Sequence, residues 1–206
     1  MSGYEGVKFT TTMLGDEVPQ DVRLAQLKQW CTFYHTHHLA PPYSGGSYGN
    51  LSFREAPDAE SFIITGTCMG LKENLRNDQF VQVSYCDMEQ RIVFARGCRK
   101  PSSESMLHFA IYQQRPDVEA IFHGHGEVIM NHAEQLGLPI TGTAEPYGTV
   151  ELAKSLLAIL ADHHILIMRD HGFIVLGNSL ADAGVRTMAL LEKAKHFRNP
   201  KKQDRY

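Results

Sequence analysis

Short apolar runs, each four to six residues long and separated by turn-forming residues, dominate the first half of the sequence. They occupy residues 51–54, 62–65, 80–85 and 91–95. Runs of this length between turn residues predict β-strands. A turn at residues 87–90 separates the last two runs at hairpin-like spacing, so the sheet is expected to be at least partly antiparallel.

Helical spacing appears beside further strands in the second half. Helices are expected from Ser102 or Ser103 to about Gln114, at 127–135, at 149–162 and from Ser179 to about Phe197, with strands at 118–123, 165–168 and 173–176. Another helix is expected within residues 19–38, ahead of the first strand. Early strands followed by interleaved helices predict one α+β or mixed α/β domain with helices covering a sheet.

The chain length favours one domain, because 206 residues is close to a typical domain size. Residues 1–18 show no periodicity and are expected to form a flexible N-terminal arm, with residues 19–206 as the single domain. The charges nearly balance, 20 basic against 23 acidic residues, which argues against nucleic acid or a membrane as a partner held by bulk charge.

Neither a membrane-spanning run nor a secretory signal is visible. No stretch of about 18 apolar residues exists, and the first 19 residues are polar. The four cysteines are widely spaced without a C-x-x-C pair, which is typical of free thiols in a reducing compartment. A cytoplasmic location is therefore expected.

The first chemical motif is His123-Gly124-His125, at the end of an apolar strand. Side chains at positions i and i+2 of a strand point to the same side, so both imidazoles can reach one metal ion. A polar strand end with two unconnected histidines remains the alternative. His171 also ends an apolar run and precedes a glycine, and three histidines would match the ligand set of a catalytic zinc site. Asp170 is the candidate to orient one of them, or simply a solvated turn residue.

A second motif opens the helix that follows the early strands. Ser102 and Ser103 lie where free backbone N–H groups and the helix dipole attract anions, and Glu104 lies in the first turn. Beside a metal ion, Glu104 could be a ligand or a general base; without one, it is a dipole-favoured helix residue. The Gly-rich stretch 45–50 is neither a Walker motif nor a dinucleotide fingerprint, and the small-residue loop 65–70 could present N–H groups to an anion.

Together these segments resemble the class II aldolase/adducin family over residues 20–197. The motifs that carry the resemblance occur in the family's order: S-Y-G-N-L-S at 47–52, I-I-T-G-T at 63–67, P-S-S-E at 101–104, Y-Q-Q-R-P-D at 112–117 leading into H-G-H at 123–125, and D-H-G at 170–172. Each motif alone is a weak signal, whereas five in order are a strong one.

The resemblance implies a three-layer α/β/α sandwich with a mainly antiparallel central sheet, assembled as a homotetramer. It implies that His123, His125 and His171 hold one divalent metal ion per chain, usually Zn²⁺, and that Glu104 is the acid/base and a displaceable fourth ligand. The substrate phosphate would be bound by a set of polar residues: Ser47, Asn50, Thr67, Ser102 and Ser103, with Gly66 or Cys68 as substitutes for Thr67.

The reaction implied by the resemblance is reversible retro-aldol cleavage of a phosphorylated sugar by a zinc-dependent lyase. The metal would stabilise the enediolate while Glu104 moves the proton. Family epimerases tend to carry Asp at the position of Glu104, which favours an aldolase here. In these aldolases, a segment after the H-x-H strand supplies an intersubunit Tyr that protonates the leaving aldehyde. The corresponding segment here, residues 138–148, is short, and Tyr147 within it is the candidate to replace that acid.

Two other functions compete with the aldolase. One is another metal-dependent lyase or isomerase on the same scaffold: a decarboxylase, dehydratase or epimerase acting on a sugar acid or sugar phosphate. The shortness of segment 138–148 favours this second function over the aldolase. The other is a non-catalytic adducin-like interaction module, which the three histidines and Glu104 argue against, because such modules tend to lose the metal ligands.

Overall fold

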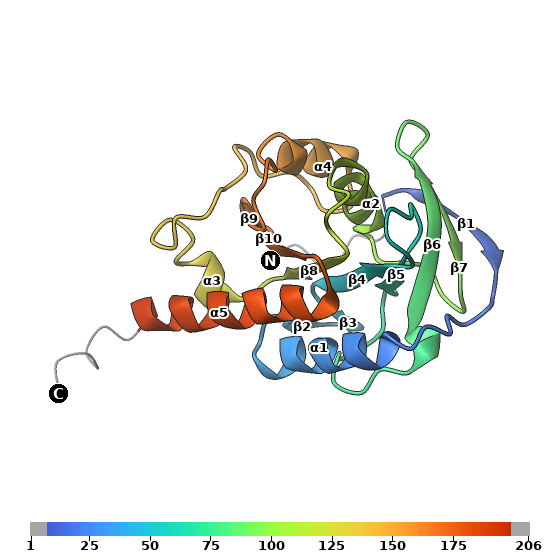
Figure 1. Ribbon diagram of the computed structural model, residues 1–206, viewed down its shortest axis with the longest axis horizontal. Coiled ribbons are helices and arrows are strands. Elements are labelled where there is room, and N and C mark those ends of the chain that lie inside the picture. Colours follow the sequence, from blue (N-terminus) through green and yellow to red (C-terminus); the bar gives the residue numbers. More distant parts are fainter. Residues whose placement is uncertain (1–7, 199–206) are drawn as a thin grey trace.

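A central sheet forms the middle of the computed structural model, which describes residues 8–198 (Figure 1). Its strands lie in the order β1-β7-β6-β5-β4-β8-β10-β9. Their bounds are β1 Thr10–Gly15, β4 Asn50–Arg54, β5 Phe62–Thr65, β6 Phe80–Asp87, β7 Ile92–Arg96, β8 Ala120–Gly124, β9 Ile165–Met168 and β10 Gly172–Gly177. β1 pairs with β7 in parallel, and every other neighbouring pair in this sheet is antiparallel. The mainly antiparallel sheet expected from the sequence is confirmed.

Helices cover both faces of the sheet. α2 (Ser105–Gln114) and α4 (Val150–Leu157) pack on one face, while α1 (Leu24–Thr36), α3 (Glu127–Met130) and α5 (Leu180–Arg198) lie on the other (Figure 1). Two separate apolar clusters correspond to these two interfaces. The α/β/α sandwich is therefore confirmed.

The sheet is longer by one strand than the sequence pattern indicates. Residues 10–15, within the expected flexible arm, form β1. This strand pairs with β7 from Thr10 opposite Ile92 to Gly15 opposite Arg96. The pattern T-T-T-M-L-G gave no signal because β1 is an edge strand whose residues are exposed or only half-buried. The expectation of an arm is wrong for these residues, and residues 1–7 lie outside the described part.

Several helices are shorter than their periodicity predicts. α1 begins at Leu24 rather than near residue 19, and α3 ends at Met130. The expected loop after α1 contains a small hairpin, β2 (Pro42–Tyr43) with β3 (Gly46–Ser47), and a short 3₁₀ helix, η1 (Asn77–Gln79), precedes β6. The predicted cap of α5 is present, since the Asp182 amide donates to Ser179 Oγ at 3.1 Å.

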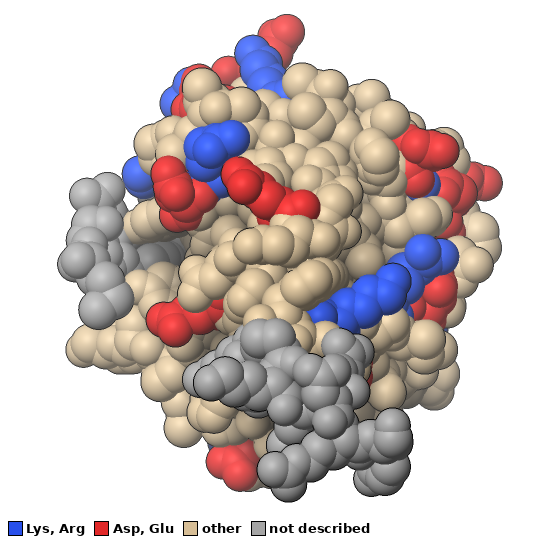
Figure 2. Space-filling model, turned by 90° about the vertical axis from the view of Figure 1, so that its left-hand side faces the viewer, with Lys and Arg blue, Asp and Glu red and all other residues tan. Residues whose placement is uncertain are grey.

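The surface carries both signs of charge. On the face in Figure 2, lysine and arginine side chains are interspersed with acidic ones over a mostly uncharged surface. Among the helices of the described chain, none is long and apolar enough to cross a membrane.

Candidate metal centre and active-site pocket

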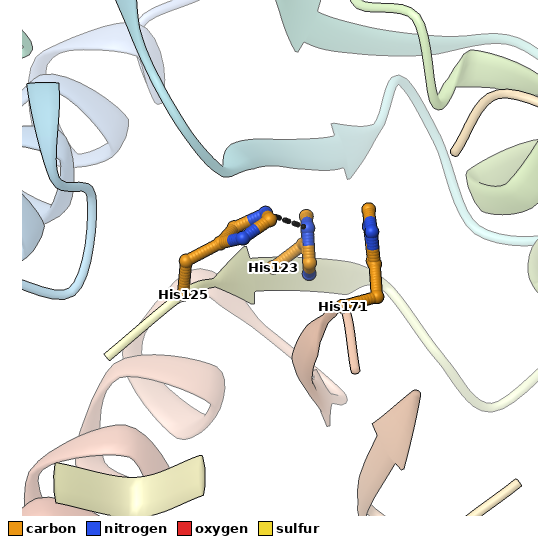
Figure 3. Close-up of side chains that lie close together, drawn as sticks. All are labelled: His123, His125 and His171. Atoms are coloured by element: carbon orange, nitrogen blue, oxygen red, sulfur yellow. Dashed lines mark hydrogen bonds between the residues drawn. The ribbon is translucent and has the colours of Figure 1, made fainter. Parts of the chain in front are cut away.

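Three histidines meet where β8 ends beside β10. His123 lies in β8 opposite Asn50 of β4 and Ile174 of β10, and His125 follows two residues later. His171 lies in the turn between β9 and β10. One ring nitrogen of each lies within 4.8 Å of those of the other two, and the rings of His123 and His171 are parallel at 5.1 Å (Figure 3). The convergence inferred from the strand ends is therefore present.

The protonation of His123 is set by the backbone. Its Nδ1 lies 2.8 Å from the carbonyl oxygen of Phe173, which can only accept, so Nδ1 carries the proton. Nε2 of the neutral ring then has a lone pair, and it lies 2.9 Å from His125 Nε2 and 3.0 Å from Glu104 Oε2. Lone pairs and a carboxylate aimed at one point fit a cation. Three imidazoles with an open fourth position form the donor set of a catalytic zinc site.

Two glycines let the backbone approach this centre closely. A Cβ on Gly172 would lie 2.5 Å from His123 Cε1, and one on Gly49 would lie 2.5 Å from the His123 carbonyl oxygen. Gly49 also has a φ of 74°, which side-chain-bearing residues rarely adopt. The glycine after His171 and the Gly-rich stretch therefore serve the packing around His123.

Glu104 is buried against the histidines at the position preceding α2. Its Oε1 lies 2.5 Å from His171 Nε2, and its Oε2 accepts from Asn50 Nδ2 at 2.7 Å. Burial raises the pKa of this carboxyl, but the opposing effect of His123, His171 and His125 holds it well below its usual range. Glu104 is therefore a carboxylate, able to accept a proton or to bind a cation.

Burial keeps two of the imidazoles, those of His123 and His125, neutral. It lowers the pKa of His123 to about 4, with His171 adding to the effect and Glu104 opposing it. Burial also lowers the pKa of His125 well below its ordinary value, with His123 and His171 acting in the same direction. Neutral rings are the form that binds metal ions.

A cavity of about 490 Å³ lies next to the histidines and Glu104. All of the residues that the family resemblance assigns to phosphate line it: Ser47, Asn50, Thr67, Ser102 and Ser103, together with Gly66 and Cys68. Two of these residues also make hydrogen bonds within the protein. Ser47 Oγ donates to the Gly70 carbonyl oxygen at 3.0 Å, and Asn50 holds Glu104.

Asp170 does not orient a ligand histidine. It is exposed in the β9–β10 turn with a φ of 55°, and it makes no hydrogen bond to the three imidazoles in the part of the chain described. The Phe173 carbonyl performs that task for His123. A backbone acceptor leaves no signal in the side-chain pattern of a sequence.

Several cavity residues were missed by sequence reasoning. Lys72 is buried in the cavity wall, Tyr48 packs on His125 with ring centroids 4.9 Å apart, and Arg169 lies at the rim beside His171. Tyr147, a residue the sequence could not place, also lines the cavity. Only the fold brings these residues together, because they come from different loops, and apart from Tyr48 none lies within one of the motifs given above.

The fold and the site together define a class of α/β protein. A sheet covered by helices on both faces carries a histidine triad at the ends of neighbouring strands, with a buried glutamate beside it. The chain belongs to the family described as "Class II Aldolase and Adducin N-terminal domain", whose model matches residues 31–197. This result confirms the resemblance drawn from the sequence motifs.

Relatives of known name in this family differ in their reactions. The chain is 29% identical over 167 residues to an L-fuculose phosphate aldolase of Methanocaldococcus jannaschii, covering 74% of this chain and 85% of that protein. It is 27% identical over 174 residues to a 3-oxo-tetronate 4-phosphate decarboxylase of Haemophilus influenzae, covering 75% and 79%. The crystal structure of L-fuculose-1-phosphate aldolase from Thermus thermophilus shares the fold, with a TM-score of 0.67 at 20% identity over 88% and 95% of the two chains.

Proposed function

We propose that this protein is a metal-dependent carbon–carbon lyase, an aldolase that reversibly cleaves a phosphorylated sugar. The observation that carries the proposal is the meeting of three imidazoles and one buried carboxylate at the cavity. His123, His125 and His171 would hold one Zn²⁺ per chain. The bound metal would polarise the substrate carbonyl and stabilise the negative charge that develops beside it.

Glu104 is the proposed proton acceptor. Its carboxylate is ionised, faces the histidines, and is held on one oxygen by Asn50. A base held 2.5 Å from His171 Nε2 lies within reach of a substrate atom bound at the same centre. Asn50 Oδ1 is buried and takes no partner among the described residues, so it can accept a hydrogen bond from a substrate hydroxyl.

The proton donor for the leaving aldehyde is proposed to be Tyr147. Its position in the cavity wall supports this role, because the segment that carries it borders the same cavity as Glu104. Lys8 lies over the Tyr147 ring, 4.8 Å from its centroid, and ties the segment before β1 to the cavity.

A decarboxylase of a phosphorylated sugar acid is the second candidate. Arg169 favours it, because its exposed guanidinium lies at the cavity rim two residues from His171, where it could pair with a substrate carboxylate. Only its Nε has a side-chain hydrogen bond in the described chain, to the Thr141 carbonyl oxygen at 3.0 Å. The similarity to a named decarboxylase points the same way.

The test combines metal analysis with a substrate screen. Protein purified without chelator should contain about one zinc ion per chain, and His123→Ala should lose it. The metal-loaded protein is then screened against ketose 1-phosphates for aldehyde release and against 3-oxo-tetronate phosphates for CO₂ release. Aldehyde release supports the aldolase, whereas CO₂ release alone supports the second candidate.

Glu104→Gln should lower turnover of the accepted substrate by at least about 100-fold, because it removes the base without changing the shape of the side chain. Glu145→Gln is the matched control, since Glu145 lines the same cavity but is only half-buried and has no hydrogen bond or ion pair to the three histidines within the described residues. If the wild type binds no metal even after soaking in zinc, the lyase proposal fails and an adducin-like interaction module becomes the better explanation. Light scattering of the same samples tests the expected homotetramer.

A further inference from the structure

Lys72 is a buried cation in the wall of the cavity. Only 2% of its surface is exposed. Its Nζ donates to the carbonyl oxygens of Ser47 and Tyr48, at 3.1 and 3.0 Å, and to Ser47 Oγ at 3.0 Å. These contacts use all three protons of the ammonium group.

The charge of Lys72 has no counter-ion. Within the described residues no carboxylate lies within 4 Å of its Nζ, and the three oxygens that bind it are neutral. Burial lowers the Lys72 pKa to about 8, while Cys31 and Glu104 act in the opposite direction. Burying an ammonium group is unfavourable unless its charge is compensated, and a methionine would fill the same space without that cost. An uncompensated cation beside a cavity therefore indicates an anionic ligand.

Lys72 also joins two loops of the cavity. Its hydrogen bonds to Ser47 and Tyr48 hold the Gly-rich stretch 45–50. Ser47 Oγ in turn donates to the carbonyl oxygen of Gly70, in the loop 65–70. We call Lys72, Ser47 and Gly70 the lysine clamp. Because the Ser47 hydroxyl both donates and accepts within the clamp, its role is to connect the loops.

Unused donors lie next to the lysine clamp. The amides of Cys68, Met69 and Gly70 make no hydrogen bond within residues 8–198, and neither do the amide and hydroxyl of Ser103 at the start of α2. All four residues line the cavity. Backbone N–H groups from a loop and a helix start are the donors that bind phosphate oxygens.

We propose that Lys72 is a positioning residue for the anionic group of the ligand. The lysine clamp fixes the two loops so that their amides face one subsite, and its buried positive charge attracts a phosphate there. The inference rests on the proposed function in one respect, since it takes the anion to be the phosphate of the substrate. It adds a residue that no motif of the sequence indicated.

The test measures binding of inorganic phosphate to the zinc-loaded protein by calorimetry. Lys72→Met should weaken phosphate binding at least about 10-fold, because it removes the charge and the clamp together. Lys72→Gln keeps a hydrogen-bonding group but no charge, and it should fall between Lys72→Met and the wild type. Lys154→Met is the matched control, since Lys154 is an exposed lysine of α4 outside the cavity; its phosphate affinity should equal that of the wild type.

A pH series separates charge from a purely structural effect. Phosphate affinity of the wild type should fall as pH rises through about 8, the pKa of Lys72, and this fall should be absent in Lys72→Gln. The other groups around Lys72 do not titrate there: burial keeps the Cys31 thiol protonated with a pKa of about 12, Glu104 stays ionised, and the pKa of both His123 and His125 lies far lower.

Equal phosphate affinity in Lys72→Met and the wild type would overturn the proposal, as would the same pH slope in Lys72→Gln. If Lys72→Met fails to fold, the comparison between Lys72→Gln and the wild type decides. Zinc content is measured on every sample. If the wild type binds zinc but phosphate affinity does not change when Lys72 is replaced, only this inference is overturned. If the wild type binds no zinc, the proposed function is overturned.

Discussion

At the residue scale, burial and neighbouring groups decide which titratable side chains of the site are charged and which are neutral. Glu104 remains ionised because histidines surround it. His123 and His125 remain neutral because burial lowers the pKa of each ring by more than the nearby Glu104 raises it. His108 is neutral for the same reason: burial lowers its pKa to about 3. A cluster of neutral rings around one carboxylate favours a divalent cation over protons.

His108 makes the stability of the protein depend on pH. Its Nδ1 bonds to Ser52 Oγ at 2.7 Å, and Ser52 Oγ bonds to the Tyr112 hydroxyl at 2.8 Å. Its folded-state pKa of about 3 lies below the unfolded value of 6.5, so the unfolded chain binds more protons between them. The contribution of His108 to stability is then fully present above pH 6.5 and falls by about 1.4 kcal/mol for each pH unit between 6.5 and 3.

Urea unfolding of the metal-free protein at several pH values measures this slope. His108→Gln should show a shallower loss of stability on acidification than the wild type, because one buried neutral histidine is gone. His163→Gln, at an exposed position, should keep the wild-type slope. Equal slopes in His108→Gln and the wild type would show that His108 is not buried in its neutral form.

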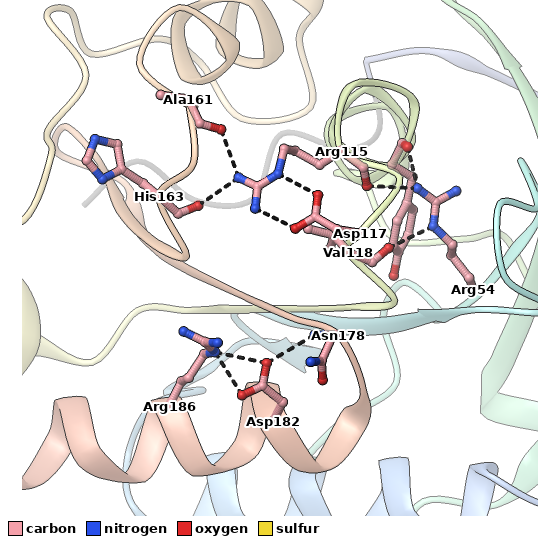
Figure 4. Close-up of polar contacts among 10 residues, drawn as sticks. Arg54, Arg115, Asp117, Val118, Ala161, His163, Asn178, Asp182 and Arg186 are labelled. Carbon is pink, nitrogen blue, oxygen red and sulfur yellow. Dashed lines mark hydrogen bonds and ion pairs between the residues drawn. The ribbon is translucent and has the colours of Figure 1, made fainter.

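At the element scale, α2 places Glu104 in the site and Arg54 fixes the other end of that helix. The buried Arg54 guanidinium donates to the Tyr112 and Arg115 carbonyls at the end of α2, and its Nε donates to the Val118 carbonyl at 2.7 Å (Figure 4). Carbonyls at a helix C-terminus have no partner within the helix, and a cation there satisfies them and opposes the helix dipole.

Arg54→Met should therefore destabilise the protein by about 3–5 kcal/mol, because several buried carbonyls lose a charged donor at once. Chemical denaturation measures the change in the free energy of unfolding. Arg76→Met is the control: Arg76 is exposed and pairs with Asp78 on the surface, so its loss should leave the free energy of unfolding almost unchanged. A similar loss in both variants would contradict the role given to Arg54.

The same scale shows what the sequence could and could not predict. Histidines that end apolar strands are visible as a pattern, because strand ends meet at a sheet edge, and this located the candidate metal centre. Lys72 and Arg54 were not visible, since most of their partners are carbonyl oxygens 24 to 64 residues away in the chain. β1 was missed because an edge strand is mostly exposed and so lacks alternation of apolar and polar residues.

At the scale of the whole molecule, the candidate metal centre brings together parts of the fold that are distant in sequence. Glu104 comes from the start of α2, His123 from the end of β8, and His171 from the β9–β10 turn. The unfolded chain cannot hold these groups together, so a metal ion bound by them stabilises the folded state alone. Binding at 100 times the dissociation constant adds about 2.7 kcal/mol.

Removal of the metal should therefore lower the melting temperature. For a domain of this size, about 1 kcal/mol corresponds to roughly 2–4 °C, so chelation should cost about 5–10 °C at that metal excess. His171→Asn should melt at the same temperature with and without zinc, because it removes one of three ligands. His163→Asn should retain the full zinc-dependent shift, since His163 is exposed on a turn away from the triad. A zinc-dependent shift that survives in His171→Asn would show that the metal binds elsewhere. If the melting temperature of the wild type does not change with zinc, the histidine triad does not bind this metal.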